Sequence, residues 1–290
     1  MNDAAATSIR YGSLPGVAAT TGWQAKLALG FCERDGHTVL AKREHTGPLI
    51  VQKTLHPEGP SVCQAIVVHP PGGIAGGDRL DLAVDVGARA HAQLTTPGAS
   101  KWYRSAGALA RQDFAARVGA HANLEWLPQE AIVFDGARAV LATTIALAAG
   151  ATFIGWDVVC LGRTHAGERF ATGSFTQSLQ LLRDDVLLWC DRLTLAGGSR
   201  ALQSGAILNG APVFGTMLAA GNIDDEMLGS CRRVLCDDGE VAVTRVPHVL
   251  VARYRGGSAP AARMYFATLW RVLRPALIGR AAVTPRIWNT

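Results

Sequence analysis

The sequence predicts a mainly β protein, and two observations support that prediction. Segments in which apolar and polar residues alternate at period two recur along most of the chain, as in residues 79–86, and such alternation is typical of half-buried strands. Glycine, proline or aspartate bounds these segments at a spacing of about 10 to 12 residues, which favours a meander of antiparallel strands. Helical periodicity appears only late in the chain, so about two α-helices are expected in the C-terminal third.

The expected strands follow one another from residue 22 onwards. They cover residues 22–31, 38–44, 47–55, 61–69, 79–86, 88–95, 109–118, 122–127, 139–147, 152–161, 173–182 and 186–195, with a hairpin in 241–255. One helix is expected in 224–235, because acidic residues lie in its first turn and arginines lie towards its end, as the helix dipole favours. A second helix is expected in 260–273, with Pro275 as its stop.

The same pattern predicts the domain organisation. Residues 1–21 are small and polar and are expected to form a mobile N-terminal tail. No break in composition divides the remainder, so residues 22–290 are expected to form one β-rich domain.

Composition excludes several classes of function. Hydrophobic residues make up 49% of the 290 and charged residues 18%, which is enough apolar material for a substantial core. The net charge of +5 is scattered and accompanies no nucleic-acid-binding motif, so no nucleic-acid partner is expected. No apolar run is long enough for a membrane span. The six cysteines are dispersed, without a CxxC motif, which favours a reducing cytoplasm.

Standard catalytic motifs are also missing from the sequence. The glycine-rich stretch 69–78 lacks the lysine of a P-loop and the spacing of a dinucleotide-binding loop. There is no GxSxG elbow and no HExxH pair, and the eight histidines never fall at HxH or HxxxH spacing.

Three polar loops nevertheless stand out in this apolar chain, and each has an ordinary structural interpretation beside a functional one. Residues 69–78 form either a tight turn tied by Asp78 or part of a site. Residues 95–105 hold Trp102, Tyr103 and Arg104, which form either a solvated loop or a partner surface, because Trp, Tyr and Arg dominate interface hot spots. Residues 125–135 carry three carboxylates that either face water, line a polar passage or ligate a metal.

Six blocks of sequence together resemble the urease accessory protein UreD (UreH) family. They are HPPGGIAGGD (69–78), LTTPGASKWYRS (94–105), LEWLPQE (124–130), FIGWD (153–157), LGR with GERF (161–163 and 167–170) and PRIWNT (285–290). They occur in the family's order and span nearly the whole chain from Trp23. The resemblance implies an elongated superhelical, multi-sheet β-fold.

The resemblance also implies a chaperone or scaffold and not an enzyme. Its expected partners are the urease apoprotein, a UreF-type accessory protein and, through that protein, a UreG-type GTPase. No cofactor is expected to bind tightly, but Ni²⁺ is expected to pass transiently on its way into urease. Candidate residues for a polar nickel path are Asp78, Thr96, Glu130, Asp135 and Glu168, because weak oxygen ligands let a cation pass where a Cys/His cage would hold it. Trp102, Tyr103 and Arg104 are the candidate partner contacts.

A different class of function stays open from the sequence. The chain is alternatively an all-β hydrolase with Glu125, Glu130 and Asp135 as its acid and base. That alternative requires the three carboxylates to converge in one pocket.

Overall fold

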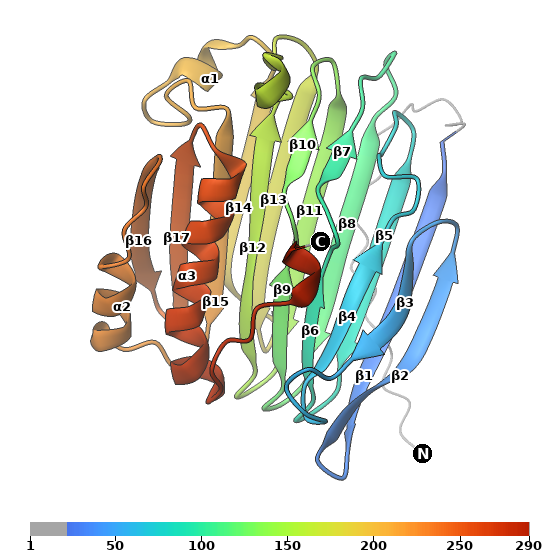
Figure 1. The fold of residues 1–290 in the computed structure, drawn as a ribbon, viewed down its shortest axis with the longest axis vertical. Helices are drawn as coiled ribbons and strands as arrows, with labels where there is room; N and C mark the ends of the chain where they lie inside the picture. The colour runs from blue at the N-terminus through green and yellow to red at the C-terminus, as the bar shows by residue number, and fades with distance from the viewer. Residues whose placement is uncertain (1–21, 290) are drawn as a thin grey trace.

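Two large β-sheets face each other in the computed structural model, which describes residues 22–289 (Figure 1). The expected tail, residues 1–21, lies outside the described part of the chain. One sheet has seven strands in the order β14-β13-β11-β8-β5-β1-β2. The other has ten, with the path β16-β17-β15-β12-β9-β6-β4-β3, and off this path β10 pairs with β12 and β7 pairs with β10. Their bounds are β1 Gln24–Arg34, β2 His37–Thr46, β3 Ile50–Leu55, β4 Cys63–Val68, β5 Arg79–Val86, β6 His91–Thr95, β7 Ser100–Trp102, β8 Ala110–Val118, β9 Asn123–Leu127, β10 Ala131–Val133, β11 Arg138–Leu147, β12 Thr152–Leu161, β13 Ser174–Arg183, β14 Val186–Ala196, β15 Val213–Ala220, β16 Glu240–Val246 and β17 Val249–Gly256.

The centre of each sheet is parallel, which corrects the antiparallel meander expected from the sequence. β1, β5, β8, β11 and β13 pair in parallel in one sheet, and β4, β6, β9 and β12 do so in the other. From β4 to β13 the chain alternates between the sheets, so each coil lays a strand in one sheet and the next strand in the other. The architecture is therefore a β-solenoid, flanked by antiparallel strands such as β2 and β14. Mainly β structure, in several sheets, is confirmed.

Tight turns at one end of the solenoid explain why successive coils stack. Residues 87–90, 119–122 and 148–151 connect the two sheets in three successive coils. Their third residues, Arg89, His121 and Gly150, all have positive φ, of 60°, 56° and 69°. Each turn also bonds to the coil before it, as in the 2.7 Å bond from the Gly119 amide to the Val86 carbonyl. We call this end the lower end, and the opposite end, with its longer loops, the upper end.

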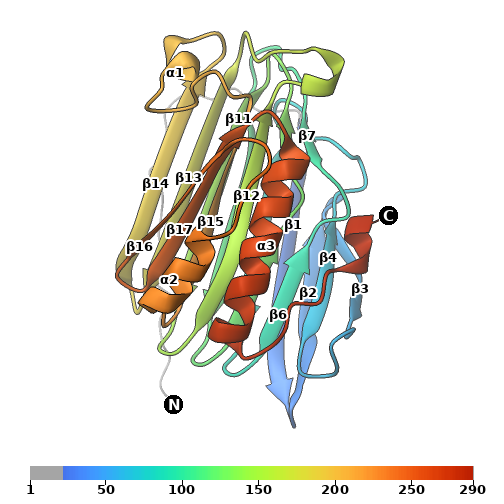
Figure 2. The same cartoon turned by 60° about the vertical axis from the view of Figure 1, so that its left-hand side comes forward.

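The two longer helices cover the outer face of the ten-stranded sheet (Figure 2). They are α2 Asp225–Arg232 and α3 Ala259–Ile278, whereas the short α1 Arg200–Gln203 follows β14 at the upper end, and 3-10 turns form η1 Thr164–Ala166 and η2 Arg286–Asn289. The two expected helices are thus present as α2 and α3. However, α2 ends before the expected residue 235, and α3 continues through Pro275 to Gly279, whose φ of 73° ends it. Packing against the sheet keeps α3 regular although proline removes one of its hydrogen bonds.

Two apolar layers hold these parts together. The larger lies between the sheets and includes Phe114, Trp126 and Phe175, and the second lies between the ten-stranded sheet and α2 and α3. The sequence pattern does not predict β15, because all eight of its residues are buried and the alternation that marks a half-exposed strand is absent. None of the helices in residues 22–289 has the length and hydropathy needed to cross a lipid bilayer.

Candidate functional site

The loops at the upper end bring three of the predicted polar stretches together. Residues 69–78, 103–109, 134–137 and 162–173 all connect strands at this end, in successive coils. The glycine-rich loop pairs with β7, because the Ile74 amide donates to the Lys101 carbonyl at 2.7 Å and the Tyr103 amide donates back to Ile74 at 2.9 Å. A Cβ on Gly73 would lie 2.1 Å from the Tyr103 ring, so glycine is required for this close approach.

Asp78 ties the glycine-rich loop to the first strand. Its Oδ1 accepts the Trp23 amide and its Oδ2 accepts the Ala75 amide, both at 2.8 Å. The side chain is buried, and both of its oxygens are already bonded to the backbone. Within residues 22–289, the nearby His69 has a buried Nε2 without a hydrogen-bond partner, and burial lowers the pKa of its imidazole while the Asp78 charge opposes that shift.

Asp135 and Glu168, two of the predicted path residues, meet at the upper end. Asp135 Oδ1 accepts the Thr172 amide at 2.7 Å, and its Oδ2 accepts Arg104 Nη2 at 3.0 Å. Glu168 pairs with Arg163 at 2.9 Å and also accepts the Asp135 amide at 3.4 Å. The Thr172 amide bond lowers the pKa of Asp135, and the Arg163 hydrogen bond lowers the pKa of Glu168. Both carboxylates are therefore kept ionised and paired with arginine.

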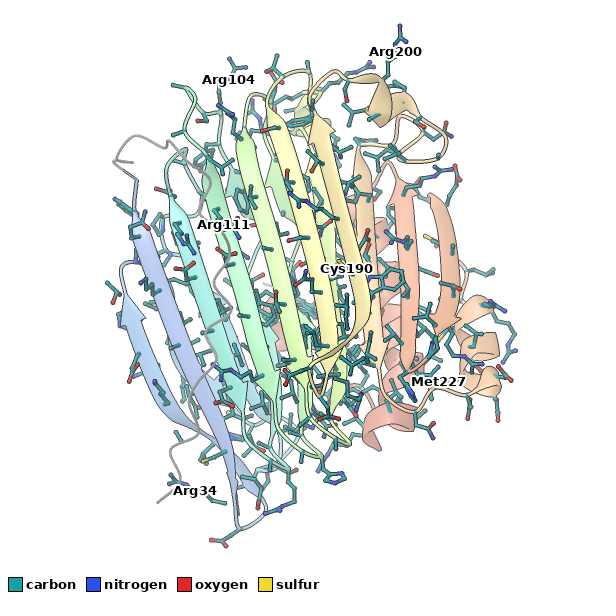
Figure 3. All side chains as sticks on the ribbon, turned by 180° about the vertical axis from the view of Figure 1, so that it is seen from behind. Arg34, Arg104, Arg111, Cys190, Arg200 and Met227 are labelled. Atoms are coloured by element: carbon teal, nitrogen blue, oxygen red, sulfur yellow. The ribbon has the colours of Figure 1, made fainter. Side chains whose placement is uncertain are left out.

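The three predicted partner contacts divide between core and surface. Trp102 is only 1% exposed and belongs to the core between the sheets. Tyr103 is 38% exposed and packs edge-on against Phe134, with ring centroids 5.2 Å apart. Arg104 is largely exposed, and Figure 3 shows it projecting at the upper end, opposite Arg34 at the lower end. Of the three, only Tyr103 and Arg104 therefore have side chains that reach the surface.

A cavity of about 250 Å³ lies between the two sheets beneath these loops, and it opens to the outside among the exposed residues Gly72, Pro97 and Gly98. We call it the interior cavity. Leu82 and Leu141 of the seven-stranded sheet face Trp126 and Val158 of the ten-stranded sheet across it. Its polar lining comprises His69, Thr96, Ser100, Lys101, Gln112, Gln129 and Asp157. Thr96 is thus the predicted path residue that lines this cavity. Its hydroxyl accepts the Gln129 amide at 2.9 Å.

Asp157, on β12, also lines this cavity, and it is not among the site residues predicted from the sequence. Burial raises the pKa of its carboxyl to about 6, although hydrogen bonds from Gln177 and Thr143 oppose the shift. Asp157 also borders a void of about 10 Å³ that is shared with Thr216, and Thr216 lines an outer groove of about 500 Å³ between β14 and β17. These three spaces adjoin one another through shared lining residues, and the smallest, beside Asp157, is a narrow point between the other two. The sequence signal that could have identified Asp157 is a charged residue within an otherwise apolar strand.

Glu130 follows β9 at the outer side of the same cavity. Its Oε2 lies 2.9 Å from Arg263 Nε of α3, and its side chain is only 15% exposed. The backbone carbonyl of Glu130 accepts the Ser100 amide at 2.9 Å.

Glu125 lies in a fully buried network instead of a pocket. Its carboxylate accepts Arg274 Nε at 3.0 Å, Trp270 Nε1 at 2.5 Å and a 2.7 Å bond involving His91 Nε2. Arg274 also pairs with Glu58 at 2.7 Å, so it joins α3 both to β9 and to the loop before β4. Burial acts to raise the pKa of Glu125, but His91 and Arg274 outweigh it and hold that pKa below its ordinary value.

The three carboxylates of the hydrolase alternative thus have separate surroundings. Glu125 pairs with Arg274, Glu130 with Arg263, and Asp135 with Arg104. General acid–base catalysis requires the carboxylates to converge in one pocket, and these three do not. Across residues 22–289, His, Cys, Asp and Glu side chains form no group of three or more able to hold a metal ion.

Comparison with known proteins decides which family this architecture represents. The model of the UreD urease accessory protein family matches residues 24–289. The chain belongs to the UreD urease accessory protein family. The urease accessory protein UreD of Dechloromonas aromatica (strain RCB) is 53% identical over 273 residues, which cover 92% of this chain and 95% of that protein.

Other UreD proteins are similar over the same span. The protein of Azoarcus sp. (strain BH72) is 52% identical, covering 94% of this chain and 96% of its own length. The protein of Pseudomonas aeruginosa is 50% identical, covering 96% and 99%. The resemblance found in the six sequence blocks is confirmed, and the chain is a urease accessory protein involved in urease maturation.

Proposed function

We propose that this UreD family member is a non-catalytic scaffold that helps to insert nickel into urease. It binds the urease apoprotein and a UreF-type accessory protein, and it reaches a UreG-type GTPase through the UreF-type protein, in the cytoplasm. The observation that carries this proposal is the family match over residues 24–289, with relatives at 50% identity or more. The partners follow from the family and not from any contact in the structure.

Nickel is the cargo in this proposal, and it moves through the interior of the solenoid. Support comes from the interior cavity, whose wall offers Thr96 and Asp157. Asp157 is a weak, single oxygen ligand for a borderline cation, which suits transit better than tight binding. The narrow point beside Asp157 requires side chains to move for an ion to pass.

The remaining predicted residues take different places along the proposed route. Glu130 stands where the cavity wall meets α3, and its only close cation is Arg263 among the described ion pairs. Asp135 and Glu168 would act at the upper end, where each must exchange an arginine for the metal. Asp78 would have to release the Trp23 and Ala75 amides, so its first role is to hold the loop.

The route is tested by co-expressing the urease genes with Glu130→Gln, which removes the charge and keeps the shape. Glu44→Gln is the matched control, because Glu44 is exposed on β2, pairs with Lys42 and lines none of these spaces. The accessory complex is expected to be captured intact, and the nickel content of urease is expected to fall severalfold for Glu130→Gln only. Normal nickel content in urease matured with this variant would refute the role of Glu130.

The partner surface is tested separately with Arg104→Ala, measured by capture of the UreF-type protein and of the urease apoprotein. Arginine and tyrosine side chains are typical hot spots, so we expect capture of one partner to weaken by at least about tenfold. Arg34→Ala, at the lower end, is the control (Figure 3). Unchanged capture of both partners by Arg104→Ala would remove this surface from the proposal.

A further inference from the structure

A short segment separates the interior cavity from an outer groove beside α3. Residues 128–130 interrupt the ten-stranded sheet between β9 and β10. Pro128 and Gln129 line the interior cavity on one side. The same two residues line an outer groove of about 210 Å³ on the other side, bounded by Arg263 of α3 and by Trp288. The wall between cavity and groove is thus only one segment thick.

Side chains provide most of the contacts that hold this segment in place. On the cavity side the Gln129 amide donates to the Thr96 hydroxyl at 2.9 Å. On the groove side Arg263 Nη1 donates to the Gln129 side-chain oxygen, and Trp156 Nε1 donates to the Pro128 carbonyl at 3.0 Å. One backbone bond, from the Ser100 amide to the Glu130 carbonyl at 2.9 Å, anchors its end. The segment is therefore less firmly held than the ladders of β9 and β12 beside it.

The C-terminal residues fasten the strand end next to this segment. Trp288 lies beside Trp156 and Trp270, with ring centroids 5.9 and 6.0 Å apart. Its Nε1 donates to the Thr95 hydroxyl at 2.8 Å, and that hydroxyl donates to the Leu127 carbonyl at 2.6 Å. Trp288 thereby holds the residue that precedes Pro128, and it does so from the outer face of the sheet.

The charge pair at the wall is close but poorly aligned. Glu130 Oε2 lies 2.9 Å from Arg263 Nε, yet in residues 22–289 neither of these two buried atoms makes a hydrogen bond. By contrast, Arg163 donates two side-chain hydrogen bonds to Glu168 at the upper end. A buried carboxylate and guanidinium without directed bonds lose less when they separate.

We infer that residues 128–130 form a movable wall of the interior cavity, held shut from the outside by Arg263 and Trp288. When the wall moves, the cavity joins the groove beside α3, and Glu130 leaves Arg263 with its carboxylate free for a cation. The functional role of this motion rests on the proposed nickel route, whereas the motion itself is a property of this chain. It gives the interior cavity an opening beside α3, in addition to its mouth at Gly72, Pro97 and Gly98.

The motion is measured by hydrogen exchange of the full-length protein without nickel. The reporters are the amides of Gln129 and Ser100, because both lose their acceptors when the segment moves. Arg263→Gln removes a charged hydrogen bond, so exchange at both amides is expected to accelerate by about tenfold or more. Arg271→Gln is the control, because Arg271 lines the same groove but donates to Thr284. Amides of β12 report whether the whole fold has loosened.

Unchanged exchange of the two reporter amides in Arg263→Gln would overturn the inference. Equal acceleration in β12 would also count against it, because the segment would then open only with the whole fold. Trp288→Phe, which removes one donor and keeps the aromatic packing, is a second variant expected to accelerate the same amides. If Arg263→Gln accelerates exchange but Glu130→Gln leaves urease nickel normal, the role of Glu130 in the route fails while the movable wall stands. If the wall is rigid but Glu130→Gln lowers urease nickel, the movable wall fails while the route stands.

Discussion

Asp157→Asn tests the unusual electrostatics of the interior most directly. The Asp157 side chain is only 8% exposed, and its hydrogen-bond partners in the described structure, Gln177 and Thr143, are neutral. Burial raises the pKa of this carboxyl to about 6. A carboxyl whose pKa is higher in the folded protein than in the unfolded chain destabilises the fold when it ionises. Asparagine keeps the shape and removes that cost, so the variant is expected to be more stable at neutral pH.

The magnitude of this effect follows from the shift and depends on pH. One pKa unit corresponds to about 1.4 kcal/mol. The pKa of Asp157 is about 6 in the folded protein, and its ordinary value is 3.8. Above pH 7 the variant is therefore expected to gain about 3 kcal/mol in the free energy of unfolding. The gain falls to about 1.6 kcal/mol at pH 5 and to about 0.5 kcal/mol at pH 4, because the carboxyl is increasingly protonated in both states.

Urea denaturation at several pH values measures the difference in unfolding free energy between wild type and variant. Taking the difference cancels the other titrating groups, which the two proteins share. Asp85→Asn, an exposed acid on the outer face of β5, is the matched control and should stay within about 0.5 kcal/mol at every pH. A gain for Asp157→Asn that does not change between pH 5 and pH 8 would refute the assignment of a raised pKa to this carboxyl.

Two further substitutions test the packing of the fold. Arg274→Met should lower the free energy of unfolding by about 3–5 kcal/mol at pH 7, because it leaves Glu58 and Glu125 buried without their shared cation. Adding Glu125→Gln should recover part of that loss in the same denaturation assay, and a purely additive double variant would contradict the ion-pair account. Gly73→Ala should cost about 1–3 kcal/mol, since the new methyl group meets the Tyr103 ring. Tyr103→Ala in the same chain should remove most of that penalty, whereas an undiminished penalty would place the strain in the backbone.

The strands are predictable from the sequence because alternation reports which residues face the core. The strand predicted in 79–86 has the bounds that β5 has in the structure. Alternation does not report which strand lies beside which, and this is why it predicts a meander where coils in fact stack in parallel. A signal for the coils is present in the turns Gly87-Ala-Arg-Ala90 and Gly119-Ala-His-Ala122, which repeat nearly the same sequence after equivalent strands. A repeated turn of this kind predicts stacked coils.

The site is less predictable, because its geometry depends on which face each side chain takes. Thr96 lines the interior cavity, but Trp102, further along the same stretch of sequence, is buried in the core. The sequence allows Asp78 to belong to the turn or to the path, and the structure shows its oxygens bonded to the Trp23 and Ala75 amides. Asp157 escapes prediction because a single acid in an apolar strand carries no motif.

Two buried carboxylates in the ten-stranded sheet have opposite electrostatic surroundings. Glu125 is neutralised by Arg274 and bonded to Trp270, so its charge is compensated and it fastens α3 to the sheet. Asp157 has no basic hydrogen-bond partner among the described residues, and its raised pKa records an uncompensated cost. A cost of about 3 kcal/mol is a large part of the stability of an ordinary domain. Under the proposed nickel route, a cation beside Asp157 would lower the pKa of this carboxyl and so remove that cost. Nickel bound transiently at Asp157 would therefore stabilise the folded protein, and this links the stability measurement to the proposed function.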